Sequence, residues 1–171
     1  MILVTVGTHD HGFNRLVQPM DVLAAELDEI VIIQRGSSTY EPRYAEHFQW
    51  ASGQRMQELN REARVVVMHA AAGSILLALL ERKAIVVVPR QPQFNECIDD
   101  HQHQLASALD TQNRAVALIQ PSKDSLRAAI ERAARQETKC YQNTQLVQAL
   151  NQQLNIWKLR PEQPASLFRK G

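Results

Sequence analysis

The sequence has few cysteines, few glycines and few aromatic residues, and it contains no long hydrophobic run. The two cysteines, Cys97 and Cys140, fit no metal-binding or redox spacing, which is typical of a protein in the reducing cytoplasm. The longest wholly apolar runs cover only a few residues, too few to cross a membrane. The N-terminus lacks the basic start and the longer apolar region of a signal peptide. We therefore expect a cytoplasmic protein whose first apolar run, residues 2–6, is a core strand.

An excess of charge of either sign is also missing. Nineteen basic residues stand against eighteen acidic ones, and no basic arm or patch occurs, so nucleic acid is not expected as a partner. The six histidines are not combined with carboxylates or thiols at a known ligand spacing, so no metal site is expected. A length of 171 residues is enough for one domain with a sizeable core.

Short apolar runs alternate with segments of helical periodicity along most of the chain. Strands are predicted at residues 2–6, 30–33, 65–68, 85–88 and 115–119, with a weak short strand at 48–51. Helices are predicted at residues 13–28, 54–62, 75–81, 98–109, from 121 onward and at 141–157. Continuous apolar strands in this alternation favour an α/β fold, a Rossmann-like parallel sheet with helices on both faces. Residues 1–157 would then form a single domain, followed by a loose tail at 158–171.

Three of the six glycines come just after predicted strands. Gly7, Gly36 and Gly73 each stand where the chain turns from a strand toward a helix. Glycine there permits a positive φ and lets a ligand approach the backbone closely, although any single glycine is equally well explained as a turn former. Parallel strands point their C-terminal ends one way, so all three turns share one edge of the sheet. Together they favour a ligand crevice at that edge.

Two of these turns resemble anion sites. Gly7-Thr8 and Gly73-Ser74 place free backbone N–H groups at or near a helix start, where the helix dipole also suits a phosphate or diphosphate. Neither turn is a dinucleotide-binding fingerprint, and no Walker A sequence occurs.

The histidines near the strand ends have two interpretations each. His69 follows a predicted strand and either contacts a phosphate or sugar or simply ends the strand. His9 lies in the first loop, where it either faces the reacting centre or is an exposed polar residue. The sequence does not decide between these alternatives.

Polar side chains after the strand at 85–88 are ambiguous in the same way. Asp100 and Gln102 open a predicted helix, where they either accept hydrogen bonds from sugar hydroxyls or interact with the helix dipole. Arg90 and Arg35 follow strands and either balance phosphate charge or lie on the surface.

Several motifs occur in an order that resembles a known family. They are Ile2-Leu-Val-Thr-Val-Gly-Thr8 with Phe13-Asn-Arg-Leu-Val17, Gln34-x-Gly36-x-Ser38, His69-Ala-x-Ala-Gly-Ser-Ile-Leu76, and Val86-Val-Val-Pro-Arg90 with Phe94-Asn-Glu96 and Asp100-His-Gln102. Over about residues 1–120 the chain resembles the C-terminal domain of family 28 glycosyltransferases. It is most similar to the stand-alone form, the catalytic subunit of the eukaryotic dolichol-linked chitobiose GlcNAc transferase and its bacterial relatives in exopolysaccharide and capsule synthesis.

The resemblance implies one half of a GT-B glycosyltransferase that is split into two chains. This chain would bind a UDP-sugar donor, and a membrane-associated partner would hold a lipid-linked saccharide acceptor, keeping this chain peripheral to the inner face of the membrane. The reaction would be inverting and would need neither metal nor other cofactor.

The resemblance also implies roles for individual residues. The diphosphate would lie against Gly7, Thr8, Gly73 and Ser74. The motif residues Gln34, Gly36, His69 and Arg90 would line the donor crevice. The sugar would be held by Asn95, Glu96, Asp100 and Gln102. The catalytic base is not identified, with His9 and His69 as the candidates in this chain.

One position departs from the family pattern. Leu77 stands where the family usually has a glutamate that contacts the ribose of the nucleotide. Leucine forms no hydrogen bond, so ribose recognition is either supplied by another residue or weakened. This departure keeps a second function open, a non-catalytic subunit that stabilises a transferase partner. A third alternative is another nucleotide-binding α/β enzyme.

Overall fold

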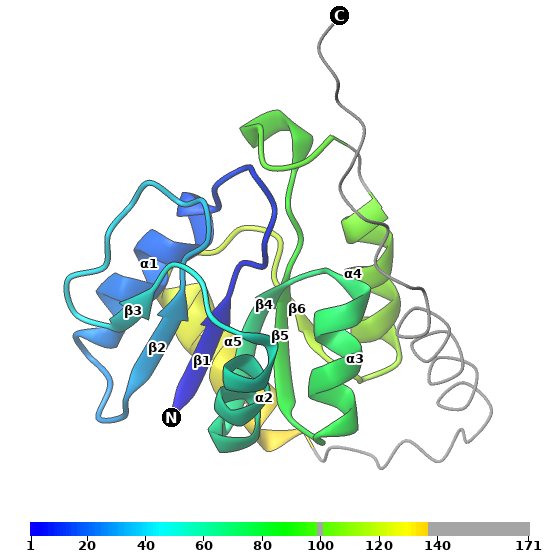
Figure 1. The fold of residues 1–171 in the computed structure, drawn as a ribbon. Helices are drawn as coiled ribbons and strands as arrows, with labels where there is room; N and C mark the ends of the chain where they lie inside the picture. The colour runs from blue at the N-terminus through cyan, green and yellow to red at the C-terminus, as the bar shows by residue number, and fades with distance from the viewer. Residues whose placement is uncertain (99–100, 137–171) are drawn as a thin grey trace, which may run out of the picture. The chain divides into compact units, whose positions relative to one another are not determined.

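A computed structural model describes residues 1–98 and 101–136, all within one compact unit. Six parallel strands form a single sheet in the order β3-β2-β1-β4-β5-β6 (Figure 1). The strands are β1 (Ile2–Thr5), β2 (Val31–Gln34), β3 (Glu46–Phe48), β4 (Val65–His69), β5 (Ala84–Val88) and β6 (Val116–Ala117). The predicted helix at 141–157, the predicted tail at 158–171 and Asp100 lie outside the described residues.

Helices cover both faces of this sheet, which confirms the predicted Rossmann-like α/β fold. One face carries α1 (Asn14–Ala24) and α5 (Lys123–Arg135). The other face carries α2 (Gly53–Glu62), α3 (Ala72–Leu80) and α4 (His101–Thr111). A short 3₁₀ helix, η1 (Pro92–Phe94), follows β5.

The central strands are buried on both sides, which explains their continuous apolar sequences. Successive side chains of a strand point to opposite faces. Ile2 and Val4 of β1 therefore pack against α1 and α5, whereas Leu3 packs against α2, α3 and α4. Each of these three side chains is at most 1% exposed. Full burial of such a side chain contributes about 1.5–3 kcal/mol relative to exposure, so the pattern fixes the register of the sheet.

The helix starts differ in a way that matters for the site. The Ser52 hydroxyl caps α2 by accepting from the Arg55 N–H, and Ser122 and Ser125 form a capping box at α5. In contrast, α3 begins after Ala71 and has no side-chain cap. The N-terminal N–H groups of α3 are therefore left for another acceptor.

Several predicted boundaries are wrong by a few residues. The strand predicted at 48–51 is β3 at Glu46–Phe48, because its partner β2 ends at Gln34 and the chain turns at Gly36, which has φ +52°. The helix predicted from Ile75 starts at Ala72, since alanine favours a helix and no β-branched residue precedes Ile75 in this turn. The last strand is shorter than predicted because it pairs only with β5.

Asp21 of α1 holds the segment that leads into β3. Its fully buried carboxylate accepts hydrogen bonds from the N–H groups of Arg43, Tyr44 and Ala45 and from the Tyr40 hydroxyl, at 2.8–3.0 Å. Burial raises the pKa of this carboxyl, but the four hydrogen bonds together lower it below its usual value of 3.8. The charged form of Asp21 therefore stabilises the fold.

We expect Asp21→Ala to lower the free energy of unfolding by about 3 kcal/mol, because buried N–H groups lose a charged acceptor. Urea denaturation at pH 7 measures this change. Tyr40→Phe is the matched control, since it removes one of the four hydrogen bonds and should cost about 1 kcal/mol. The depressed pKa means that the contribution is present above pH 3.8 and lost as the pH falls through the lower pKa of the folded state. Equal losses in the two variants would contradict this account.

Candidate functional site

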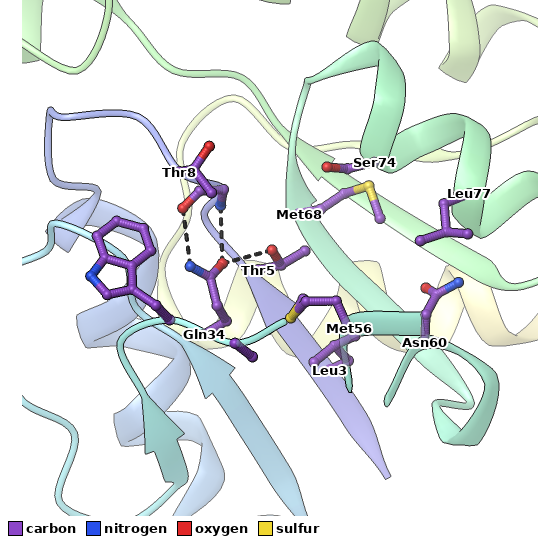
Figure 2. Close-up of a pocket in the computed structure, with 12 residues that line it drawn as sticks. Leu3, Thr5, Thr8, Gln34, Met56, Asn60, Met68, Ser74 and Leu77 are labelled. Atoms are coloured by element: carbon purple, nitrogen blue, oxygen red, sulfur yellow. Dashed lines mark hydrogen bonds between the residues drawn. The ribbon is translucent and has the colours of Figure 1, made fainter. Parts of the chain in front are cut away.

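A pocket of about 170 Å³ opens at the C-terminal end of β1 (Figure 2). The neighbours of β1 are β2 on one side and β4 on the other, so the chain connections leave in opposite directions at this point. Ligands of open α/β sheets bind in the crevice at such a switch point. The pocket is lined by Leu3, Thr5, Gly7, Thr8, Gln34, Trp50, Ala51, Met56, Asn60, Met68, Ser74 and Leu77.

Gln34 at the end of β2 holds the loop that forms one wall of the pocket. Its side-chain oxygen accepts from the Thr5 hydroxyl at 2.8 Å and from the N–H groups of Val6 and Gly7 at 3.1 Å. Its side-chain nitrogen donates to the carbonyl oxygens of Gly7 and Gln49. Both donors and the acceptor of this amide are thus engaged, and the side chain is only 4% exposed. Gln34 shapes the pocket wall and has no free hydrogen-bonding group for a ligand.

Two of the predicted glycines are required by their surroundings. Gly7 has φ +77°, and a Cβ there would lie 2.5 Å from Cε1 of His69. Gly36 has φ +52°, and a Cβ there would lie 2.8 Å from the Gly7 carbonyl oxygen. A side chain at Gly7 would therefore collide with the His69 ring, and one at Gly36 would collide with the backbone of the loop after β1.

His69 ends β4 and packs its ring against Gly7. The side chain is 7% exposed, and its Nδ1 has no hydrogen-bond partner among the described residues. Burial, helped by the positive charge of Arg90, lowers the pKa of His69 to about 4. The imidazole is therefore neutral at pH 7 and is a weak base there. His69 is not among the residues that line the pocket.

The start of α3 provides the second polar wall of the site. Among the residues that the structure describes, none accepts a hydrogen bond from the N–H groups of Ala72, Gly73 or Ser74. Ser74 lines the pocket, and a Cβ on Gly73 would meet no atom within 4 Å. Free N–H groups at the positive end of a helix bind anions. The structure thus brings the predicted Gly7, Thr8 and Ser74 into one pocket, with Gly73 beside it.

Arg90 lies outside this pocket and is 1% exposed. Its guanidinium donates to the carbonyl oxygens of Val6, His11, Gly12 and Glu96 at 2.9–3.0 Å and stacks on the Phe13 ring. Burial lowers the pKa of Arg90, and the charge of Glu96 opposes this effect. Neither alternative left by the sequence describes Arg90, because its guanidinium is bonded within the protein and is not at the surface.

Glu96 is buried in a second network. Its carboxylate pairs with the Arg15 guanidinium at 2.8 and 3.0 Å and accepts from the Gln91 N–H at 3.0 Å. With 4% of its surface exposed, Glu96 holds the loop after β5 and does not face solvent. Arg15 also donates to the carbonyl oxygens of Pro89 and Ile119, so it joins α1 to that loop.

The remaining predicted residues are dispersed. His9 is exposed, and its Nδ1 accepts from the His11 N–H. Asn95 is exposed, with φ +55° at the end of η1. Gln102 in the first turn of α4 accepts from the Arg90 N–H at 3.1 Å. None of these three side chains lines the pocket.

Sequence reasoning missed the contribution of α2 and of the loop before it. Trp50, Met56 and Asn60 all line the pocket. Trp50 falls within the strand predicted at 48–51, whereas the structure places it in a loop with 48% of its surface exposed. An aromatic residue just before the Ser52 helix cap was the available signal. Asn60 had a signal too, as a polar residue on the apolar face of a predicted helix.

No group of three or more His, Cys, Asp or Glu side chains suited to a metal ion occurs within residues 1–98 and 101–136. Over the same residues, no helix is both long enough and apolar enough to span a bilayer.

The low pKa of His69 predicts a pH dependence of stability. Between pH 6.5 and about 4 the unfolded chain takes up a proton that folded His69 does not, so stability falls as the pH falls. The full shift corresponds to about 3 kcal/mol. We expect His69→Gln to remove this part of the slope in urea denaturation series measured from pH 7 to pH 4. Identical slopes for the two proteins would show that His69 titrates as in the unfolded chain.

Solved structures of GT-B glycosyltransferases resemble this fold. CalG4, the calicheamicin glycosyltransferase, matches with a TM-score of 0.64 and 17% identity over 94% of this chain and 44% of its own. The glycotransferase of kitacinnamycin matches with a TM-score of 0.61 and 21% identity over 79% and 35%. MurG of Acinetobacter baumannii matches with a TM-score of 0.57 and 19% identity over 89% and 49%. The chain therefore spans less than half the length of each, and at these identities the likeness shows the fold alone.

The sequence comparisons identify the family. No curated protein matches the chain. The family model of the glycosyltransferase family 28 C-terminal domain matches residues 1–158, which is most of the 171-residue sequence. That match agrees with the fold, which corresponds to the C-terminal half of a GT-B glycosyltransferase. The chain belongs to the glycosyltransferase family 28 C-terminal domain family.

Proposed function

We propose that this chain is the donor-binding, catalytic subunit of a two-chain inverting GT-B glycosyltransferase that uses a UDP-sugar. One observation supports this most directly. An exposed tryptophan, Trp50, and the uncapped start of α3 contribute to the same pocket at the switch point of the sheet. An aromatic ring stacks on a nucleobase, and free helix N–H groups bind a diphosphate. A nucleoside diphosphate needs both.

The transfer itself would exchange one bond at the sugar. The oxygen of an acceptor hydroxyl bonds to the anomeric carbon while the bond from that carbon to the UDP oxygen breaks. The electron pair of the broken bond goes to the diphosphate, whose charge the N–H groups at the start of α3 stabilise. In this proposal those N–H groups take the place of a metal ion at the leaving diphosphate.

The hydroxyl proton requires a general base. His69 is a weak base at neutral pH, because burial lowers its pKa to about 4. His9 is exposed and is the alternative within this chain. We propose that the acceptor-binding chain, and neither of these histidines, supplies the base.

The acceptor side belongs to the same proposal. The chain spans less than half of CalG4, of the kitacinnamycin glycotransferase and of MurG, and GT-B enzymes use two halves. We propose that a membrane-associated partner supplies the second half and a lipid-linked saccharide acceptor. The product would be an intermediate of polysaccharide biosynthesis, formed by a complex at the inner face of the membrane.

A non-catalytic stabilising subunit is the second candidate, and Leu77 favours it. This side chain lines the pocket without offering a hydrogen bond. A chain that had lost donor binding would tolerate leucine there. Titration with nucleotides separates the two functions.

We expect the purified chain to bind UDP and UDP-sugars in isothermal titration calorimetry, alone or with the acceptor-binding chain. Trp50→Ala should weaken UDP binding about tenfold or more, since stacking a base on an aromatic ring contributes about 1–3 kcal/mol. Trp50→Phe keeps an aromatic face and is the matched control, with a smaller loss. UMP should bind more weakly than UDP because it lacks the second phosphate.

Absence of UDP binding, with and without the partner, would refute the donor-binding function and leave the stabilising one. Equal affinities of the wild type and the Trp50→Ala variant would show that the base does not lie on Trp50.

A further inference from the structure

Asn60 is a buried amide whose position the fold does not explain. It lies in α2, is 3% exposed and lines the pocket. Its Nδ2 has no hydrogen-bond partner among the described residues. Asparagine is a poor helix former, and a buried donor without an acceptor costs free energy. An apolar side chain at this position would give a more stable fold. A bound ligand that accepts a hydrogen bond from Nδ2 would explain why an amide is present.

The surroundings of Asn60 show which kind of acceptor fits. Figure 2 shows Asn60 and Leu77 on one side of the pocket, opposite Thr8 and Gln34. The other nearby pocket residues on this side, Met56 and Met68, are apolar. Thr5 and Gln34 bond to each other and are not free. A single neutral donor in an apolar wall suits a neutral oxygen, such as a hydroxyl, better than a charged phosphate.

The start of α3 fixes the orientation of a nucleotide in this pocket. Ser74 lies in the first turn of α3, and Leu77 follows one turn later on the same face. A diphosphate held by the N–H groups at that start would place the attached ribose about one helical turn, roughly 5.4 Å, farther along. That position is beside Leu77 and Asn60. The base would then extend toward Trp50.

We propose that Asn60 binds the ribose of the donor nucleotide, with Nδ2 donating a hydrogen bond to a ribose hydroxyl oxygen. The proposal rests on the proposed function, because it requires a nucleoside diphosphate at the start of α3. It makes Asn60 a residue through which the pocket recognises a hydroxyl group of the donor's sugar ring. A structural neighbour, VinC, was solved in complex with dTDP, a deoxyribonucleotide.

Calorimetric titration of the full chain with UDP, 2′-deoxy-UDP and 3′-deoxy-UDP tests this role. We expect the wild-type chain to bind UDP about tenfold more tightly than at least one of the deoxy analogues, the usual size of one lost hydrogen bond to a buried group. The Asn60→Leu variant should bind UDP only as tightly as the wild type binds that analogue. The affinity for the analogue should be the same in the variant and in the wild type. The melting temperature of Asn60→Leu should not fall, since the substitution removes an unsatisfied donor.

Met56→Leu is the matched control, one turn earlier on the same face of α2. It should change the affinities of all three nucleotides by the same factor. Equal binding of the three nucleotides to the wild type would overturn the ribose contact and leave the donor-binding function in place, even if Asn60→Leu failed to fold. An equal loss of all three in Asn60→Leu would also overturn it and make Asn60 a structural residue. Failure of every nucleotide to bind the wild type would refute both proposals.

Discussion

The loop after β1 depends on two buried side chains that come from other strands. The side-chain oxygen of Gln34, at the end of β2, accepts hydrogen bonds from the N–H groups of Val6 and Gly7, and its side-chain nitrogen donates to the Gly7 carbonyl oxygen. The guanidinium of Arg90, just after β5, donates hydrogen bonds to carbonyl oxygens of the same loop. A buried guanidinium needs hydrogen-bond acceptors, and carbonyl oxygens of this loop are three of the four that Arg90 bonds to, so the loop stabilises the buried charge. Side chains from β2 and from the end of β5 therefore hold this wall of the pocket in place.

This arrangement separates polar groups that are engaged from polar groups that are free. Gln34, Arg90 and Glu96 are buried and bonded within the protein. The N–H groups at the start of α3 and the Asn60 Nδ2 have no partner among the described residues. A binding site needs groups of the second kind, because a ligand gains most from donors that the fold leaves unsatisfied. Ser74 at the start of α3 and Asn60 both line one pocket, and Gln34 holds a wall of it.

Much of the fold could be predicted from the sequence. The continuous apolar strands, the Ser52 cap and the order of strands and helices all follow from local patterns, and the structure confirms them. The site was harder to predict, because arginine and glutamate after a strand have the same pattern whether they face a ligand or a loop. Arg90 and Glu96 were predicted to line the donor site, but Arg90 bonds to carbonyl oxygens of the loop after β1 and Glu96 pairs with Arg15 of α1. Trp50 was missed because a short edge strand is set by its pairing partner, not by its own residues.

The sequence by itself determined the parallel sheet, the burial of its strands and the edge at which three glycine turns meet. These features depend on hydrophobic periodicity and on backbone freedom, which are properties of short segments. Only the tertiary structure decided which polar side chains are satisfied and which are free. That distinction depends on partners far away in the chain, as between Gly7 and Gln34 or between Asn60 and its apolar neighbours. Hydrogen bonding acts over a few ångströms in space, whereas the sequence records only neighbours along the chain.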